Sequence, residues 1–343
     1  MLVNIASNDI AALQKWNWVI WPLILLLTAL TLLMERERRT AVPLAGSAVQ
    51  ATAERLEGLQ RAHMIIRVRS SWITGVLGQS LHAAARAAVA SPGRPLSAGQ
   101  PVSLWNLVYV QGETAETIAA QTPIVDIFER KVGGALLIEG GPGSGKTTLL
   151  LQLASDLLDL AETEPVRPIP VIFKLASWTP SRSLHDWLVD ELQKLYDVPP
   201  NLGRNLIESA QVIPLLDGLD ELRSENRARC VMAINSYRDQ LGMQPLAVTI
   251  RSDDYKKLNP QLRVQGTIRM DPPNVSQIAA YLDEVGIQDP HIQAALNKDP
   301  QKLASPLVLN IVALAYQRRS GTDLFTDDNP EAWRPNLLRV YVD

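Results

Sequence analysis

The stretch "GALLIEGGPGSGKTTLLLQLA", residues 134–154, decides the fold. A short apolar run bounded by glycines predicts a buried strand, and the leucine-rich run from Lys146 onward predicts a helix. Between them, Gly140, four further residues, Gly145, Lys146 and Thr147 have the spacing of a phosphate-binding loop, and the strand before and the helix after are the context this loop requires. The stretch therefore predicts a site for the phosphates of a nucleotide.

The residue types of this loop suit an anion. Glycines let the backbone wrap so that its N–H groups converge on phosphate oxygens, and the following helix directs the positive end of its dipole at the same charge. Lys146 is expected to reach the β- and γ-phosphates, and the Thr147 hydroxyl to bind Mg²⁺. The candidate nucleotide-binding residues of the loop are Gly140, Gly141, Pro142, Gly143, Ser144, Gly145, Lys146, Thr147 and Thr148.

A second stretch, "PLLDGLDEL" (residues 214–222), places three acids after a predicted strand. Asp217 ends that strand and is the candidate Mg²⁺ residue, often through water; its alternative role is to cap the following turn. Asp220 and Glu221 are candidates for polarising the attacking water, or else ordinary acids at the start of the next helix. The sequence does not choose between them.

Strands and helices alternate through the middle of the chain. This pattern predicts an α/β fold, a P-loop NTPase with a parallel five-stranded sheet flanked by helices. From about residue 274 only helical patterns follow, which predicts a helical subdomain. The predicted strands are 134–140, 168–176, 212–217, 245–250 and 266–270, and the predicted helices of the core are 146–161, 183–196 and 225–241.

Composition excludes several classes of protein. With 46% hydrophobic and 20% charged residues among 343, the chain is globular rather than disordered. A net charge of −3 indicates no nucleic-acid partner. The single cysteine, Cys230, cannot form an internal disulfide, and the scattered histidines have no metal-ligand spacing.

Residues 16–34, "WNWVIWPLILLLTALTLLM", carry no charge and predict a single transmembrane helix. At 1.5 Å per residue they span roughly 28 Å, close to the thickness of a bilayer's hydrocarbon core. A cleaved signal peptide and a buried helix of a soluble domain are the alternatives. Arginines dominate the "ERERR" that follows, so the C-terminal side should face the cytoplasm. This predicts a single-pass protein of the cell membrane with a cytoplasmic NTPase domain.

Five segments in order resemble a known family: "VRSSWITGVLGQSL", "IPVIFKLASW", "LHDWLVDELQKLY", "PLLDGLDE" and "SPLVLNIVALAY". Together with the phosphate loop, they resemble bacterial NACHT-type NTPases, of the signal-transduction ATPases with numerous domains, in a subgroup with an N-terminal membrane helix. The resemblance covers roughly residues 59–316.

The resemblance implies further roles. Arg251, ending "LAVTIR", and Thr249 would sense the γ-phosphate, although Ile250 stands where the family has a hydroxyl residue; a surface arginine is the alternative. Pro306 would pack near the adenine. The cofactors implied are ATP or ADP with Mg²⁺, and the partners are further copies of the chain and an unknown protein, in defence or cell death. "LNKDP" (residues 296–300) resembles a guanine-reading motif but is interpreted as a helix end, which favours ATP over GTP.

The predicted organisation is a short N-terminal segment (1–15), the transmembrane helix (16–34), a juxtamembrane helical region and linker (35–103), the NACHT P-loop NTPase core (104–271) and a helical subdomain (272–343), truncated relative to the family pattern. Arg61, Arg67 and Arg69 form a basic patch, suited to anionic lipid headgroups or to the solvated face of a helix. Two functions remain open: a membrane-anchored ATPase acting as a signalling switch, and a nucleotide-binding scaffold with negligible turnover that assembles at the membrane.

Overall fold

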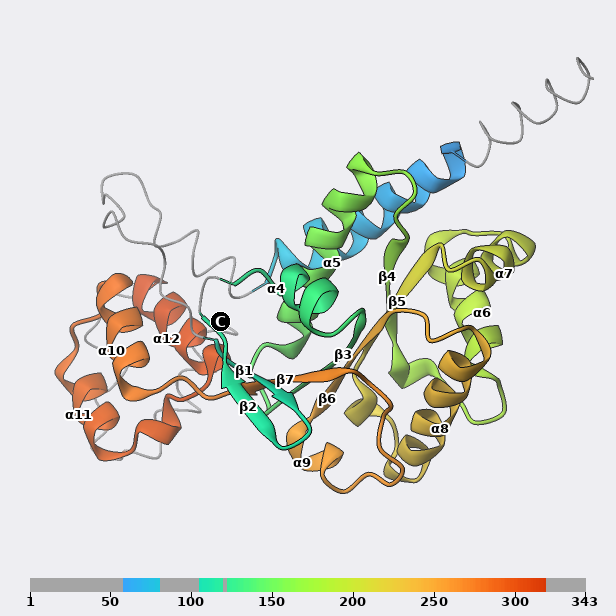
Figure 1. Cartoon of the computed structure of the whole chain (residues 1–343). Helices are drawn as coiled ribbons and strands as arrows, with labels where there is room; N and C mark the ends of the chain where they lie inside the picture. The colour runs from blue at the N-terminus through green and yellow to red at the C-terminus, as the bar shows by residue number, and fades with distance from the viewer. Residues whose placement is uncertain (1–57, 81–104, 120–121, 319–343) are drawn as a thin grey trace, which may run out of the picture. The chain divides into compact units, whose positions relative to one another are not determined.

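The computed structural model describes residues 58–80, 105–119 and 122–318 (Figure 1). The chain divides into two units at residue 64, and the strands and labelled helices described below lie in the second, 64–343. Among the described residues no helix has the length and apolar character needed to cross a bilayer. The predicted membrane helix, residues 16–34, lies outside them.

A seven-stranded sheet forms the centre of this unit, in the order β2-β1-β7-β3-β6-β5-β4. The strands are β1 (Asn106–Gln111), β2 (Thr114–Thr117), β3 (Ala135–Gly140), β4 (Ile169–Lys174), β5 (Val212–Asp217), β6 (Leu246–Arg251) and β7 (Gly266–Asp271). Strands β3 to β7 pair in parallel, so the α/β prediction is confirmed for a P-loop NTPase-like fold.

The prediction of five strands is wrong, because β1 and β2 extend the sheet beyond β7 as an antiparallel hairpin. These strands precede the phosphate loop and escape a pattern search for a simple reason. Strand β2, "TAET", is exposed at every position and so has no apolar alternation. The turn between them begins with Gly112 at φ 59°, the conformation that two-residue hairpin turns require at their first position.

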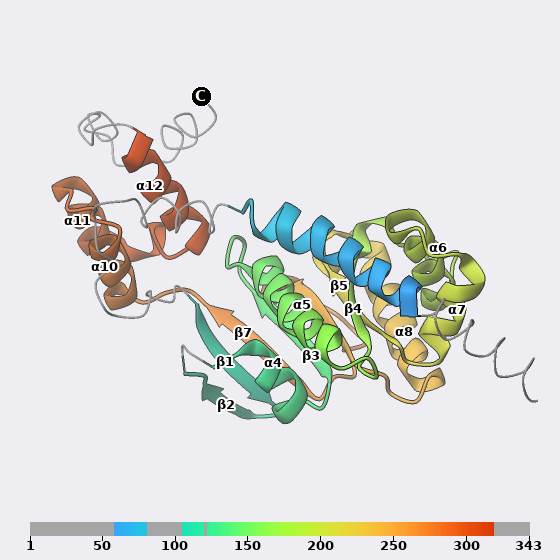
Figure 2. The ribbon, with the colours of Figure 1, turned by 90° about the horizontal axis from the view of Figure 1, so that it is seen from above.

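The helices of the unit are α4 (Ile124–Asp126) continued by η2 (Ile127–Lys131), α5 (Lys146–Thr163), η3 (Leu175–Ser177), α6 (Leu184–Tyr196), α7 (Pro200–Glu208), η4 (Leu219–Glu221), α8 (Ser224–Gln240), α9 (Ser252–Tyr255), α10 (Val275–Glu284), α11 (Pro290–Lys298), η5 (Pro300–Lys302) and α12 (Pro306–Arg318). An N-terminal helix over residues 58–68 continues as the π-helix η1 (Arg69–Leu77). Figure 2 shows α5 along one face of the sheet, beside η1. Helices α6 and α8 pack against each other.

The segment 64–77 belongs to the core of the sheet rather than to a separate region. Met64, Val68 and Trp72 are buried in the same hydrophobic cluster as the central strands. The indole Nε1 of Trp72 donates to the Tyr196 hydroxyl at 2.7 Å, and that hydroxyl donates to the Ile172 carbonyl, also at 2.7 Å. This chain of hydrogen bonds ties the N-terminal segment through α6 to strand β4.

Two arginines of the predicted basic patch are paired with acids of this same unit. Arg67 contacts Asp197 at 3.2 Å, and Arg69 contacts Asp159 and Glu162 at 2.7 and 3.0 Å. Their charges are therefore engaged within the protein, as expected for the solvated face of a helix.

Helices α10 to α12, in the region predicted to be a helical subdomain, share a hydrophobic cluster of their own. Helix α10 begins with a capping box in which Asn274 and Gln277 each satisfy the other's backbone N–H. Residues 296–300 run from the last turn of α11 into η5, as the interpretation of "LNKDP" as a helix end predicts.

Candidate functional site

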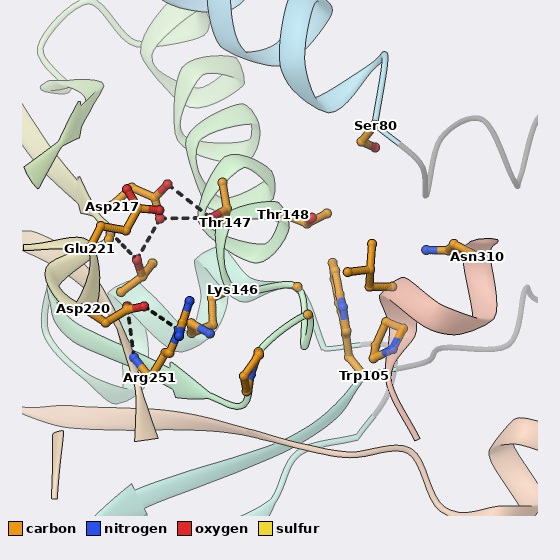
Figure 3. Close-up of a pocket in the computed structure, with 17 residues that line it drawn as sticks. Ser80, Trp105, Lys146, Thr147, Thr148, Asp217, Asp220, Glu221, Arg251 and Asn310 are labelled. Atoms are coloured by element: carbon orange, nitrogen blue, oxygen red, sulfur yellow. Dashed lines mark hydrogen bonds and ion pairs between the residues drawn. The ribbon is translucent and has the colours of Figure 1, made fainter. Parts of the chain in front are cut away.

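The carboxyl ends of the parallel strands bring the candidate residues together. Gly140 pairs with Arg251 across β3 and β6, and Lys174 pairs with Asp217 across β4 and β5. The loop after β3 therefore lies at the same sheet edge as the acids after β5. A cavity of about 390 Å³ opens there, between the phosphate loop, the ends of β5 and β6, and the start of α12 (Figure 3).

The phosphate loop has the backbone conformation its glycines allow. Gly143 and Gly145 adopt φ values of 69° and 96°, a region that side chains with a Cβ disfavour. Helix α5 begins at Lys146, whose ammonium donates to the carbonyls of Gly140 and Gly141 at 3.1 and 2.9 Å. Burial lowers the pKa of Lys146, an effect that the nearby Asp220 opposes. The loop thus offers a cation and a helix N-terminus to an anion.

Asp217 lies at the centre of a hydroxyl network. Its carboxylate accepts from Thr147 Oγ1, 3.1 Å from both oxygens, and from Thr249 Oγ1 at 2.7 Å. Thr249 Oγ1 also accepts from the Gly218 amide at 2.8 Å. Burial raises the pKa of Asp217, while the two hydroxyl bonds oppose that shift.

The residues present fit Mg²⁺. Thr147 and Asp217 bring together a hydroxyl and a carboxylate, the hard oxygen ligands that this ion prefers while it retains several waters. In the described part of the chain no group of three or more His, Cys, Asp or Glu side chains could hold a metal. The donor set is thus that of an ion held jointly with phosphates rather than by an all-protein cage.

Asp220 forms an ion pair with an arginine. Its carboxylate pairs with Arg251 Nε at 2.7 Å and accepts from the Arg251 amide at 3.1 Å. Its side chain is only 7% exposed, and its carbonyl accepts from Arg227 at 2.6 Å. Arg227 also holds the Leu222 carbonyl, at 2.9 Å. Asp220 is thereby fixed as the partner of Arg251.

Glu221 is placed differently. It is exposed and lines the cavity, and burial raises its pKa, helped by the negative charges of Asp217 and Asp220. Gly218, at φ 81°, lies directly beneath it, and a Cβ built there would come within 2.8 Å of Glu221 Cδ. Within "DGLDE", Gly218 is therefore required for two reasons: it adopts the turn conformation, and any larger residue would clash with Glu221.

Most sequence-predicted site residues line the cavity: Pro142, Gly143, Gly145, Lys146, Thr147, Thr148, Asp217, Asp220, Glu221, Arg251 and Pro306. Gly140, Gly141 and Ser144 belong to the loop but are not among the lining residues. The Ser144 hydroxyl is buried, and a Cβ at Gly140 would come within 2.7 Å of it. Gly140 therefore makes room for the loop's own packing.

Thr249, which the resemblance implies as a γ-phosphate sensor, lines the cavity. It is 1% exposed and its hydroxyl is used to hold Asp217 and the Gly218 amide. Ile250 is fully buried in the core. Of the three residues ending β6, only Arg251 has an exposed side chain, 52% accessible.

The sequence analysis did not predict several of the residues that line the cavity. Ser80, Trp105, Leu307 and Asn310 also line the cavity. Trp105 lies just before β1, in a segment without a motif, and Asn310 lies within an apolar helix whose pattern indicates only packing. The α12 residues come close to the loop: the Leu307 amide donates to the Gly143 carbonyl at 3.3 Å.

One family model matches the part of the chain that holds most of this site. Residues 135–289 match the NACHT domain. The match begins at β3 and includes the phosphate loop, the acids after β5 and Arg251, and it supports a NACHT-type NTPase. Trp105 and α12 lie outside the matched residues. The comparison with curated proteins returned no match.

Solved structures are similar only at a distance. The ORC1 protein of Aeropyrum pernix in complex with DNA has 14% identity and a TM-score of 0.42, covering 64% of this chain and 63% of that one. The RuvB Holliday junction branch migration motor of Thermotoga maritima has 12% identity and a TM-score of 0.34, covering 61% and 63%. AMPPCP-bound DnaA of Aquifex aeolicus has 15% identity and a TM-score of 0.32, covering 62% and 75%. The chain thus spans less than two thirds of the first two, and the functional argument rests on the site itself.

Proposed function

We propose that this protein is a membrane-anchored ATPase of the NACHT type, in which binding and hydrolysis of ATP with Mg²⁺ set a signalling state. The observation that carries the proposal is the arrangement at the sheet edge. Thr147 and Asp217 are hydrogen-bonded at the N-terminus of α5, and Glu221 lines the same cavity with a raised pKa.

Each residue has a distinct task in this proposal. The loop amides and Lys146 bind the phosphates and neutralise their charge. Thr147 and Asp217 would hold Mg²⁺, which would supply further neutralisation of the phosphate charge. Glu221 accepts a proton from the attacking water, and a raised pKa brings a carboxylate closer to the value that suits a base near neutral pH.

Asp220 and Arg251 act as a pair. Asp220 holds the guanidinium at the edge of the cavity, where the arginine lies within the same lining as Lys146. A cation at this position stabilises negative charge that develops on the transferring phosphoryl group. Asp220 is therefore a positioning residue, and Glu221 is the acid that handles water.

A specific observation favours a second candidate, the scaffold with negligible turnover. Arg251 is engaged by both oxygens of Asp220, through its side chain and its backbone amide. An arginine kept in that pair contributes less to the transition state, and binding without hydrolysis would result. Output would then depend on assembly alone.

Three variants separate these candidates: Lys146→Ala, Glu221→Gln and Asp220→Asn. Nucleotide affinity and single-turnover phosphate release are measured side by side. The ATPase proposal predicts that Lys146→Ala abolishes binding, while Glu221→Gln retains it and slows release by about 10²–10⁴-fold. Asp220→Asn should slow release less than Glu221→Gln. Tight binding by the wild-type protein without phosphate release supports the scaffold, and unchanged hydrolysis in all three variants refutes the site.

Membrane attachment and self-association are tested separately. The uncharged run of residues 16–34 supports a single-pass anchor with the NTPase domain in the cytoplasm. Resistance of the full chain to carbonate extraction is expected, and its release into the soluble fraction would contradict the anchor. Self-association with ATP, and a protein partner that regulates it, are expected from the same proposal, and light scattering with ATP or ADP measures the first.

A further inference from the structure

The cavity has two chemically different ends. Figure 3 shows Asp217, Asp220 and Glu221 gathered at one end with Arg251, and Trp105 and Asn310 at the other, with Lys146, Thr147 and Thr148 between. Among the described lining residues, all the carboxylates lie at the first end. Phosphates held at the loop would therefore leave the rest of a nucleotide toward Trp105 and Asn310.

Asn310 is an unusual residue for an apolar helix. It is 5% exposed, and its Oδ1 accepts a hydrogen bond from the Tyr281 hydroxyl of α10 at 2.9 Å. Among the described residues the hydrogen bond of this side chain is made by Oδ1, the amide nitrogen Nδ2 is not one of the fully buried polar atoms that lack a partner, and the residue lines the cavity. The bond from Tyr281 thus fixes Oδ1 and leaves Nδ2 accessible from the cavity, where a ligand acceptor can receive its hydrogen bond.

We propose that Asn310, oriented by Tyr281, reads the base of the nucleotide and selects adenine over guanine, with Trp105 as the ring on which the base stacks. This inference rests on the proposed nucleotide-binding function and names the substrate class of the same site.

The donor and acceptor pattern of the amide decides the base. Nδ2 donates to a ring nitrogen of adenine, while the second lone pair of Oδ1 accepts from its 6-amino group, the bidentate pairing of asparagine with adenine. Guanine presents additional N–H donors at N1 and N2, which call for a carboxylate acceptor. The described carboxylates of the cavity lie at the phosphate end, and "LNKDP", the guanine-like motif in α11, is not part of the lining.

Trp105 is positioned by the phosphate loop. A Cβ at Gly145 would come within 2.9 Å of the Trp105 indole nitrogen, so the glycine lets the ring lie against the loop backbone. The ring borders the cavity next to the first turn of α12 (Figure 3). Stacking on an aromatic ring tolerates any base, so Trp105 supplies affinity and Asn310 supplies discrimination.

The test measures dissociation constants of the full chain for ATP, GTP and purine riboside triphosphate, which lacks the 6-amino group. Wild-type protein should prefer ATP over GTP by about tenfold or more. It should also bind purine riboside triphosphate more weakly than ATP. Asn310→Leu should reduce the preference to about twofold or less, and Asn310→Asp should reverse it in favour of GTP. Tyr281→Phe, which keeps the ring and its packing, should weaken discrimination without unfolding the helices.

Trp105→Ala should weaken ATP and GTP equally, by about tenfold, and Trp105→Phe should restore most of the loss. Inorganic tripolyphosphate, which has no base, is the control ligand, and its affinity should be the same in every variant.

The outcomes distinguish the two proposals. If the wild-type protein binds neither tripolyphosphate nor nucleotide, the proposed function fails. If it binds nucleotides but the ATP to GTP ratio is unchanged by Asn310→Asp and Tyr281→Phe, base reading by Asn310 is refuted while the NTPase proposal stands.

Discussion

Thr249→Val is the substitution that most directly tests why Asp217 is held in place. Valine has nearly the shape of threonine, but it removes the hydroxyl that donates to Asp217 at 2.7 Å and accepts from the Gly218 amide at 2.8 Å. Thr249 is 1% exposed, so water compensates poorly for the loss of these bonds. A hydrogen bond to a charged group contributes about 1.5–3 kcal/mol, and an unsatisfied buried N–H costs about 1–3 kcal/mol.

Allowing for the additional apolar surface of valine, we expect the variant to lose about 2–4 kcal/mol of stability, a fall in Tm of roughly 5–15 °C. Loss of this bond should also raise the pKa of Asp217, since the Thr249 hydroxyl is the largest influence that lowers it. Affinity for Mg²⁺ with ATP should fall accordingly.

Thermal unfolding of the wild-type protein, Thr249→Val and Thr249→Ser provides the assay. Serine keeps both hydrogen bonds and loses one methyl group, at a cost of about 1 kcal/mol. The reasoning is refuted if Thr249→Val melts within experimental error of the wild type, or if Thr249→Ser is the less stable of the two.

Three further predictions follow from the neighbouring residues. Gly218→Ala, at φ 81° and with Glu221 Cδ 2.8 Å from the new Cβ, should cost about 1–2 kcal/mol and slow phosphate release; unaltered release would show that Glu221 is not displaced. Lys174→Met removes a positive charge that lowers the pKa of Glu221, so the acid limb of the kcat–pH profile should move to higher pH, whereas Lys174→Arg should leave it in place; superimposable profiles for Lys174→Met and wild type would contradict this role. Burial raises the pKa of Asp217, so its ionised form destabilises the fold above that pKa and not below its unfolded value; Asp217→Asn should therefore raise Tm by about 2–4 °C at pH 7, equivalent to about 1 kcal/mol, with the gain disappearing in acid and Mg²⁺-dependent turnover lost. An equal gain at both pH values would exclude the charge as its cause.

Much of the fold follows from local sequence. The phosphate loop is contiguous, so its glycines, Lys146 and Thr147 are legible without tertiary contacts, and β5 has the bounds that its apolar run predicts, Val212–Asp217. The hairpin β1–β2 was missed because β2 is exposed throughout and, among the described strands, pairs only with β1, while β1 joins the sheet through its pairing with β7, far along the chain.

The spacing of the acids in the sequence could not predict which partners each of them has. Asp220 and Glu221 are adjacent in sequence, and only the turn at Gly218 and the position of Arg251 on β6 direct one toward an arginine and the other toward the cavity. The resemblance implies that Thr249 senses the γ-phosphate, and the structure adds that its hydroxyl donates to Asp217 of β5.

By itself, therefore, the sequence determined that a phosphate-loop motif follows β3 and that acids follow β5, because each of these features is encoded within a few consecutive residues. Only the tertiary structure decided which acid is free, what holds Asp217, and that Trp105 and Asn310 face the same cavity. Those relations join side chains from α5, β5, β6, α12 and the residue before β1, and they depend on strand register and helix packing, which no single stretch of the chain specifies.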